Sequence, residues 1–240
     1  MEFSRELPTL LRAEIELSSR SELHAYIHGA AHDGTFNRSH GTLRISQADV
    51  RWLWCLSLVF SQIGRRSWIY REGRRDVWVI ETSHRVQGRE PLRDADARAY
   101  ARGYFDAEGG LPTQTGARLY IQFVQEDFDD LAELRQLLTQ QEIQCGRLHN
   151  PSVAKDPQLW RFYVSSCSHS RFMRLVGSWH PAKRGRIAAR LNAEKALRGG
   201  NGVSMNCACR CRHTTSALLR GRGQAPNGTV TRPSESASTR

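Results

Sequence analysis

The sequence predicts an α+β protein of two pseudo-symmetric half-domains, each with the order helix, two strands, helix, two strands, helix (αββαββα). Two observations predict this fold. A stretch near residue 103 that ends a helix has a shortened copy about 75 residues earlier. Strand-like and helical runs then follow both copies in the same order. Together they indicate one structural unit present twice.

The helices expected before these two stretches share one pattern. Ala25–Gly29 (AYIHG) and Ala99–Gly103 (AYARG) both have Ala, Tyr, any residue, a basic residue and Gly. On a helix this spacing places Ala and Gly one turn apart on the same face. A face of small residues lets two helix backbones come close. We therefore expect the two helices to pack side by side and to bring their C-terminal acids together.

Each helix is followed by an acid that precedes glycine. Glu108 ends the second helix, where a pair of glycines stops it. Asp106 lies two residues earlier, and its role stays open between a cap and a group that orients the interface. The first copy is one residue shorter between its glycine and its acid, so Asp33 is the counterpart of Glu108.

The repeat continues beyond the acids. Ile45–Asp49 matches Phe123–Asp127, each at the end of an alternating run typical of a strand. Insertions in loops absorb the drift between the copies. The expected elements are strands over 42–47 and 119–125, helices over 50–63 and 128–143, and strand pairs over 67–70 with 76–82 and over 145–149 with 160–166.

With these motifs the chain resembles the LAGLIDADG homing endonuclease family in its monomeric, two-motif form. The resemblance covers roughly residues 21–195 and is strongest at Tyr100–Gly110, Ile121–Gln125 and Gly177–Lys183. It implies that the motif helices pack at the interface of the half-domains. It also implies that the final acids hold divalent metal across the scissile phosphates, and that the sheets form a DNA-binding saddle. The shortened first motif departs from the family pattern.

The residue types fit this chemistry. A phosphodiester repels nucleophiles by its negative charge, and a hard cation held by carboxylates neutralises that charge and activates water. We expect Asp33 and Glu108 to be catalytic and to ligate Mg²⁺ (or Mn²⁺), with the two acids within roughly 8 Å of each other. Solvation at a helix end is the alternative for either acid.

Three more polar residues are predicted to take part in catalysis. Gln47 and Gln125 occupy equivalent strand ends, where the resemblance suggests an amide that orders water near the metals; reading a base or capping a turn is the alternative. Lys183 matches the family's basic position after the second sheet, where it would polarise the attacking water or stabilise transition-state charge. A phosphate contact is its alternative. The first half offers Arg85 and Arg89 there, but no lysine.

Basic residues are unevenly distributed. The formal net charge is +11, and residues 183–240 hold twelve Lys or Arg against two acids, which is +10 and leaves about +1 for the rest. DNA binding by the core must therefore depend on where its arginines lie. Arginine both grips phosphates and reads guanine edges. The expected DNA-binding residues are Arg38, Arg44, Arg65, Arg66, Arg71, Arg74, Arg75, Arg118, Arg147 and Arg161.

We expect an N-terminal arm over residues 1–20, a first half-domain over 21–90, a second over 91–196, and a basic tail over 197–240. The tail is too poor in periodic apolar residues to order itself. Its cysteines lack the spacing of structural zinc sites, so it is expected to be a flexible arm with nonspecific DNA affinity, or the product of a non-coding frame. The chain has no run of 18 apolar residues and no signal-like start, which favours a soluble, cytoplasmic protein with no membrane partner; an organellar location stays open.

Two function classes follow. The first is a monomeric, site-specific double-stranded DNA endonuclease with a long recognition site, of the kind that acts in intron or intein homing. The alternative is a cleavage-deficient protein on the same scaffold, either an RNA splicing maturase that binds intron RNA or a DNA-binding regulator. The shortened first motif favours this alternative. A third class is a small enzyme of another type. The sequence contains no nucleotide-binding loop, nucleophile triad or cofactor motif that would support this class.

Overall fold

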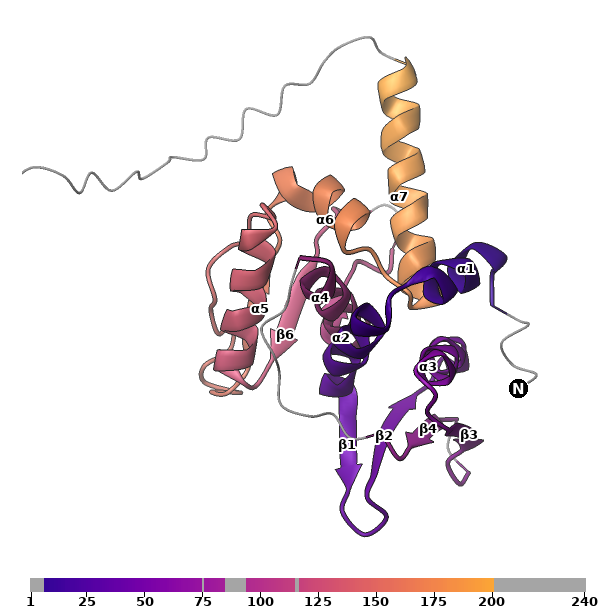
Figure 1. Ribbon diagram of the computed structural model, residues 1–240. Coiled ribbons are helices and arrows are strands. Elements are labelled where there is room, and N and C mark those ends of the chain that lie inside the picture. Colours follow the sequence, from indigo (N-terminus) through magenta and orange to yellow (C-terminus); the bar gives the residue numbers. More distant parts are fainter. Residues whose placement is uncertain (1–6, 75, 85–93, 115–116, 201–240) are drawn as a thin grey trace, which may run out of the picture. The chain divides into compact units, whose positions relative to one another are not determined.

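Helices α2 (Arg20–Ala30) and α4 (Asp94–Glu108) lie side by side, and a β-sheet begins just beyond the end of each (Figure 1). This computed structural model describes residues 7–74, 76–84, 94–114 and 117–200, with side chains up to residue 192. Helix α2 starts in a capping box, in which the Ser19 hydroxyl and the Glu22 carboxylate each accept a hydrogen bond from the other residue's backbone N–H. The entry of the first motif helix is therefore fixed locally.

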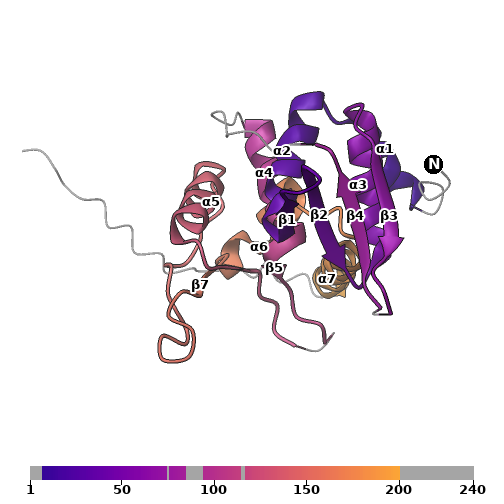
Figure 2. The ribbon, with the colours of Figure 1, turned by 90° about the horizontal axis from the view of Figure 1, so that it is seen from below.

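The first sheet has four antiparallel strands in the order β1-β2-β4-β3, which Figure 2 shows side by side. Helix α3 (Val50–Gln62) connects β2 to β3 and packs on one face of this sheet. Asp49 caps its first turn by accepting a hydrogen bond from the Arg51 backbone N–H. The strands are β1 (Gly34–Asn37), β2 (Thr42–Gln47), β3 (Ser67–Arg71) and β4 (Trp78–Thr82).

The second sheet repeats this order with shorter strands. Its named strands run β5-β6-β7, and helix α5 (Phe128–Gln140) connects β6 to β7. The predicted strand over 145–149 is only two isolated bridges, Cys145 to Val164 and His149 to Arg161. Their register differs by one residue, as in a bulge, so a regular ladder does not form. The strands are β5 (Gly109–Gly110), β6 (Gln122–Gln125) and β7 (Trp160–Tyr163).

The predicted α+β fold with two related halves is confirmed, with differences at several boundaries. The helix expected over 128–143 ends at Gln140, because Glu142 takes a left-handed backbone with φ of 56°. Ile143 still packs in the core. The second half closes with a 3₁₀ turn (Ser166–Ser168), α6 (His169–Leu175) and α7 (Pro181–Gly200). No matching closing helix is present in the described part of the first half, whose residues 85–93 lie outside it.

The two ends of the described chain are helical. The predicted N-terminal arm contains α1 (Thr9–Leu17), which buries Leu11 and Ile15 next to α3. Helix α7 passes residue 197, the expected start of the tail, and continues to Gly200. Residues 201–240 lie outside the described residues. Within the described ranges, no helix is long and apolar enough to cross a membrane.

Candidate functional site

The two motif helices touch through their glycines. A methyl group added to Gly29 would lie 2.1 Å from the backbone oxygen of Tyr100, and one added to Gly103 would lie 2.0 Å from that of Tyr26. Neither position tolerates any side chain without moving a helix. The small-residue faces predicted from the sequence are thus the contact between α2 and α4, and this contact sets where both helices end.

The acids at these ends occupy equivalent places. Gly34, which follows Asp33, pairs with Ile45 in the first sheet, and Gly109, which follows Glu108, pairs with Phe123 in the second. Asp33 ends a 3₁₀ turn (Ala31–Asp33) that continues α2, whereas Glu108 is the last residue of α4 itself. The sheet register therefore supports the match of Asp33 to Glu108 in spite of the missing residue.

Asp33 is half-buried at the start of the first sheet. Its Oδ2 accepts a hydrogen bond from the Gln47 amide, which lies at the end of β2. Burial raises the pKa of Asp33 above its ordinary value, while the Gln47 hydrogen bond and the charge of Lys183 oppose this. The Gln47 amide thus fixes the orientation of the Asp33 carboxylate.

Glu108 is the most strongly perturbed carboxyl of the pair. Burial and the negative charge of Asp33 raise the pKa of Glu108 to about 7, against the opposing effect of Lys183. The charge of Asp33 at the end of the first motif therefore acts on Glu108 at the end of the second. At neutral pH about half of the Glu108 side chains would carry a proton.

Lys183, in the first turn of α7, joins this site from the second half. Its Nζ donates hydrogen bonds to the backbone oxygens of Phe105 (2.6 Å) and Asp106 (2.8 Å), in the last turn of α4. Burial lowers the pKa of Lys183 to about 8, although Asp106, Glu108 and Asp33 all favour its charged form. The ammonium therefore caps the motif helix and lies close enough to both acids to perturb them.

The donor set of this site suits a hard divalent cation. In the described part of the chain, no group of three or more His, Cys, Asp or Glu side chains is placed to hold a metal. Asp33 and Glu108 supply two carboxylates whose pKa values are raised mainly by burial, and in Glu108 also by the charge of Asp33. Mg²⁺ needs few protein ligands and keeps several waters, so two carboxylates are a fitting set.

Gln125 does not mirror Gln47. Its Oε1 accepts a hydrogen bond from the backbone N–H of Glu126, 2.8 Å away, and so caps the turn before α5. No hydrogen bond between Gln125 and Glu108 is present among the described residues. The two predicted amides thus occupy equivalent strand ends, but only Gln47 contacts its acid.

Asp106, whose role the sequence left open, is a buried structural acid. It accepts hydrogen bonds from the Tyr26 hydroxyl (2.8 Å), the Ser178 hydroxyl, and the backbone N–H groups of Trp179 (2.9 Å) and His180 (3.1 Å). It therefore ties α4 both to α2 and to the segment that leads into Lys183. Burial raises the pKa of Asp106, and Lys183 and these donors oppose that rise.

Solved structures were found that share this arrangement. No protein-family model and no curated protein matches the sequence. Full-length DUF199/WhiA from Thermatoga maritima superposes with a TM-score of 0.57 at 15% identity, covering 80% of this chain and 72% of that one. The N-terminal LAGLIDADG domain of DUF199/WhiA gives 0.55 at 17% identity, over 70% and 90%. I-DmoI, solved with DNA and Mn, gives 0.50 at 10% identity, over 66% and 98%.

This chain has the LAGLIDADG fold. The decisive points are the two packed motif helices of this chain and the solved LAGLIDADG structures that superpose on it. At 10–17% identity these neighbours establish the fold alone. The family resemblance depended on the pattern Ala-Tyr-x-basic-Gly followed by an acid and a glycine. In the structure this pattern forms the contact between the two helices.

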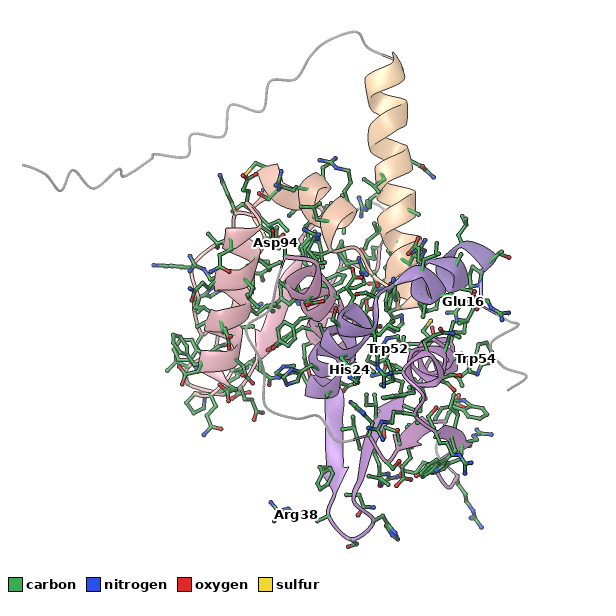
Figure 3. All side chains as sticks on the ribbon, viewed as in Figure 1. Glu16, His24, Arg38, Trp52, Trp54 and Asp94 are labelled. Atoms are coloured by element: carbon green, nitrogen blue, oxygen red, sulfur yellow. The ribbon has the colours of Figure 1, made fainter. Side chains whose placement is uncertain are left out.

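Most of the predicted DNA-binding arginines of this LAGLIDADG fold are exposed. Arg38 lies in the turn between β1 and β2, well away from the helices (Figure 3). Arg44 and Arg161 are half-buried on the strands, and Arg75 lies outside the described residues. The exposed residues are Arg38, Arg65, Arg66, Arg71, Arg74, Arg118 and Arg147.

Two of these arginines are already paired with acids. The Arg44 guanidinium lies 2.8 Å from the Glu72 carboxylate, and that of Arg71 lies 3.1 Å from Asp76. Glu81 adds a third acid to the sheet and accepts hydrogen bonds from Thr42 and Tyr70. The charge that the first sheet offers to phosphates is therefore smaller than its arginine content suggests. The positions of the arginines in the sequence did not predict that acids of the first sheet pair with them.

Proposed function

We propose that this protein is a site-specific double-stranded DNA endonuclease that hydrolyses phosphodiester bonds with divalent metal held by Asp33 and Glu108. One observation carries the proposal. Burial and the Asp33 charge raise the pKa of Glu108 to about 7, so two carboxylates that follow two packed helices interact at one partly buried place. Such an arrangement is costly unless a cation binds there.

Each residue of the site has a defined part in this proposal. When bound, Mg²⁺ or Mn²⁺ neutralises the scissile phosphate and activates water. Asp33 and Glu108 hold the ion, one from each half-domain. Gln47 holds the Asp33 carboxylate in position through its hydrogen bond. Lys183, with a pKa lowered to about 8, keeps a positive charge beside both acids and is positioned to stabilise negative charge that develops on the phosphate.

The sheets supply the binding surface in this proposal. The exposed arginines lie in the turns and strand ends of both sheets, so each half-domain can supply phosphate contacts. I-DmoI, a protein of the same fold, was solved in complex with DNA and Mn, and also with DNA and Ca. These observations support double-stranded DNA as the partner, with a long site that spans both half-domains.

One observation favours a second candidate, a DNA-binding regulator or RNA splicing maturase that does not cut. The two halves of the site are unequal: Asp33 ends a 3₁₀ turn and is held by Gln47, whereas Glu108 ends an α-helix and Gln125 does not reach it. A catalytic pair that cuts two strands needs both halves in working geometry. Cleavage of each strand must therefore be measured separately.

The test uses the full chain and selection from random duplexes. DNA that binds in Ca²⁺ is enriched, sequenced and then incubated with the protein in Mg²⁺ or Mn²⁺. We expect both strands of the selected duplex to be cut. Glu108→Gln and Asp33→Asn keep shape but remove charge, and each should reduce cutting by at least about 100-fold while binding in Ca²⁺ persists.

Glu16→Gln is the matched control, because Glu16 is an exposed acid on α1 whose ion pair among the described residues is with Arg12. It should cut like the wild type. Specific binding without any cutting in Mg²⁺ and Mn²⁺ would replace the endonuclease proposal with the regulator or maturase. Cutting that survives both Glu108→Gln and Asp33→Asn would remove these acids from the mechanism.

A further inference from the structure

The open faces of the two sheets can be compared at equivalent positions. Ile45 and Phe123 pair with the glycines after the two acids, so Thr42 corresponds to Tyr120 by counting back along each strand. Glu81 pairs with Arg44 in the first sheet as Tyr163 pairs with Gln122 in the second, so Glu81 corresponds to Tyr163. The internal repeat thus allows a direct comparison of the two sites.

In the first sheet this position is closed by a polar contact. The Thr42 hydroxyl donates a hydrogen bond to the Glu81 carboxylate. In the second sheet two aromatic rings take its place: those of Tyr120 and Tyr163 lie 6.3 Å apart, edge to face at 88°. Tyr120 is 38% exposed. At this position the second half therefore offers an exposed tyrosine ring where the first half has the buried Thr42.

A pocket of about 310 Å³ lies beside the rings of Tyr120 and Tyr163. It is smaller than the pocket of about 550 Å³ beside His28 and Phe36. Its lining includes the two tyrosine rings, the Ser166 hydroxyl and Arg118. Binding pockets for small molecules begin at roughly 300 Å³. This pocket is therefore of a size for a single small, flat group with a charged substituent.

The second ring of the pocket, that of Tyr163, is held in place by two neighbouring side chains. The Arg161 guanidinium donates a hydrogen bond to the Tyr163 hydroxyl (3.0 Å), and the His149 ring stacks on Tyr163 with 6.1 Å between ring centres and 23° between planes. Since the hydroxyl oxygen accepts from Arg161, its own hydrogen stays available to a ligand. Tyr163 is thus a fixed wall with one polar group to offer.

Arg118 provides the charge at this pocket. Its side chain is exposed and makes no hydrogen bond or ion pair with other residues that the structure describes. The backbone just before it is held by Arg190, whose guanidinium donates to the Ala117 oxygen at 2.7 Å and the Gln114 oxygen at 3.1 Å. In single-stranded nucleic-acid sites, an exposed cation binds the phosphate and a neighbouring aromatic ring stacks on the base. Arg118 and Tyr120 provide this pair of groups.

We propose that this pocket binds one unpaired nucleotide, with the base stacked on Tyr120 and its phosphate on Arg118. The inference extends the proposed DNA-binding function, since the pocket lies at the end of the second sheet. A base within a duplex cannot enter, because stacking on Tyr120 requires a free face. The ligand is therefore a single-stranded or extruded nucleotide at the edge of the bound nucleic acid. DNA and RNA share this chemistry.

The experiment measures binding of 2-aminopurine-labelled, single-stranded 12-mers of DNA and RNA to the full chain. Stacking should quench the fluorescence of the label. Tyr120→Ala should weaken single-strand binding about 10-fold, since stacking on one aromatic ring contributes about this much. Tyr120→Phe keeps the ring and should bind like the wild type. A tighter fit of the RNA 12-mer would identify RNA as the source, and a tighter fit of DNA would identify DNA.

Arg118→Ala should also weaken binding, and Arg174→Ala, which removes an exposed arginine from α6, is its matched control. Thymidine monophosphate and uridine monophosphate should compete on the wild type, which tests the pocket without any variant. Equal single-strand affinity of Tyr120→Ala and the wild type would overturn the proposal, as would the absence of quenching. Cleavage of the selected duplex by the wild type tests the endonuclease proposal, and the single-strand binding data test the pocket, so the two proposals can fail independently.

Discussion

Gly29 on α2 and Gly103 on α4 lie against each other's helix, so that a single added methyl group at either would come within about 2 Å of a backbone oxygen across the contact. Helix backbones come this close only where no Cβ separates them. The acids that follow, Asp33 and Glu108, therefore depend on two glycines for their proximity. The helix contact and the candidate site are one structural unit.

Replacing Gly103 with Ala should destabilise the protein by about 3 kcal/mol, at the upper end of overpacking effects, because the Tyr26 backbone cannot move aside as a flexible side chain would. Urea unfolding measures this. Gly185→Ala is the control: Gly185 lies in α7 with nothing within 4 Å of an added Cβ, and the change should be neutral or stabilising by about 0.5–1 kcal/mol. A Gly103→Ala protein as stable as Gly185→Ala would contradict the helix contact.

The sequence predicted what local pattern determines. The small-residue faces, the acid at each helix end and the strand-like runs are periodic features, and periodicity is set by helix and strand geometry. The end of α5 at Gln140 could not be predicted, because the left-handed Glu142 is not a residue type that marks such a stop. For Asp106 and Gln125 the sequence left two alternatives open each, and the structure shows the interface role for Asp106 and the turn cap for Gln125, since both depend on residues far away in the sequence or on rotamers.

Asp106 shows this limit best, because its partner Tyr26 is 80 residues away and Ser178 is 72 residues away. Asp106→Asn should destabilise the protein by about 3 kcal/mol, since its amide hydrogens would face the N–H groups of Trp179 and His180. Asp76→Asn, at a side chain that is 89% exposed, should change the stability by less than about 0.5 kcal/mol. Equal stability of the two variants in urea unfolding would show that Asp106 is not a structural anchor.

Removing residues 201–240 tests the charge distribution. This segment holds six arginines and one glutamate, a net charge of +5. Because each phosphate contact releases counterions, the truncated protein should show a shallower fall of DNA affinity with salt, while its preference for the selected sequence stays the same. Binding titrations at several salt concentrations check this. Loss of sequence preference on truncation would instead make the segment a recognition element.

The titration of Glu108 should appear in the pH dependence of stability. Its pKa of about 7 in the folded protein lies above the ordinary value of 4.5, so the folded protein keeps a proton that the unfolded chain releases. The stability that this proton contributes is present in full below pH 4.5 and is lost as the pH rises through 7. Compared with Glu108→Gln, the wild type should therefore lose about 1 kcal/mol between pH 5 and pH 8, a value reduced for partial exposure. Urea unfolding of both proteins at several pH values measures the difference, and parallel curves would contradict the raised pKa.

The same proton should compete with metal. A divalent ion binds ionised carboxylates, so Glu108 must release its proton first, and below pH 7 the affinity should fall by up to about tenfold per pH unit. Calorimetric titration of the wild type with Mn²⁺ at pH 6 and pH 8 should show tighter binding at pH 8. At pH 6 the observed heat should change with the ionisation enthalpy of the buffer, because the buffer takes up the proton that Glu108 releases. Asp33→Asn removes the charge that helps to raise the pKa of Glu108, so any Mn²⁺ binding that it retains should depend less on pH. Pure pH independence in the wild type would place the ion at groups other than Glu108. Binding that is unchanged in Glu108→Gln would do the same, and would move the candidate metal site away from the ends of the motif helices.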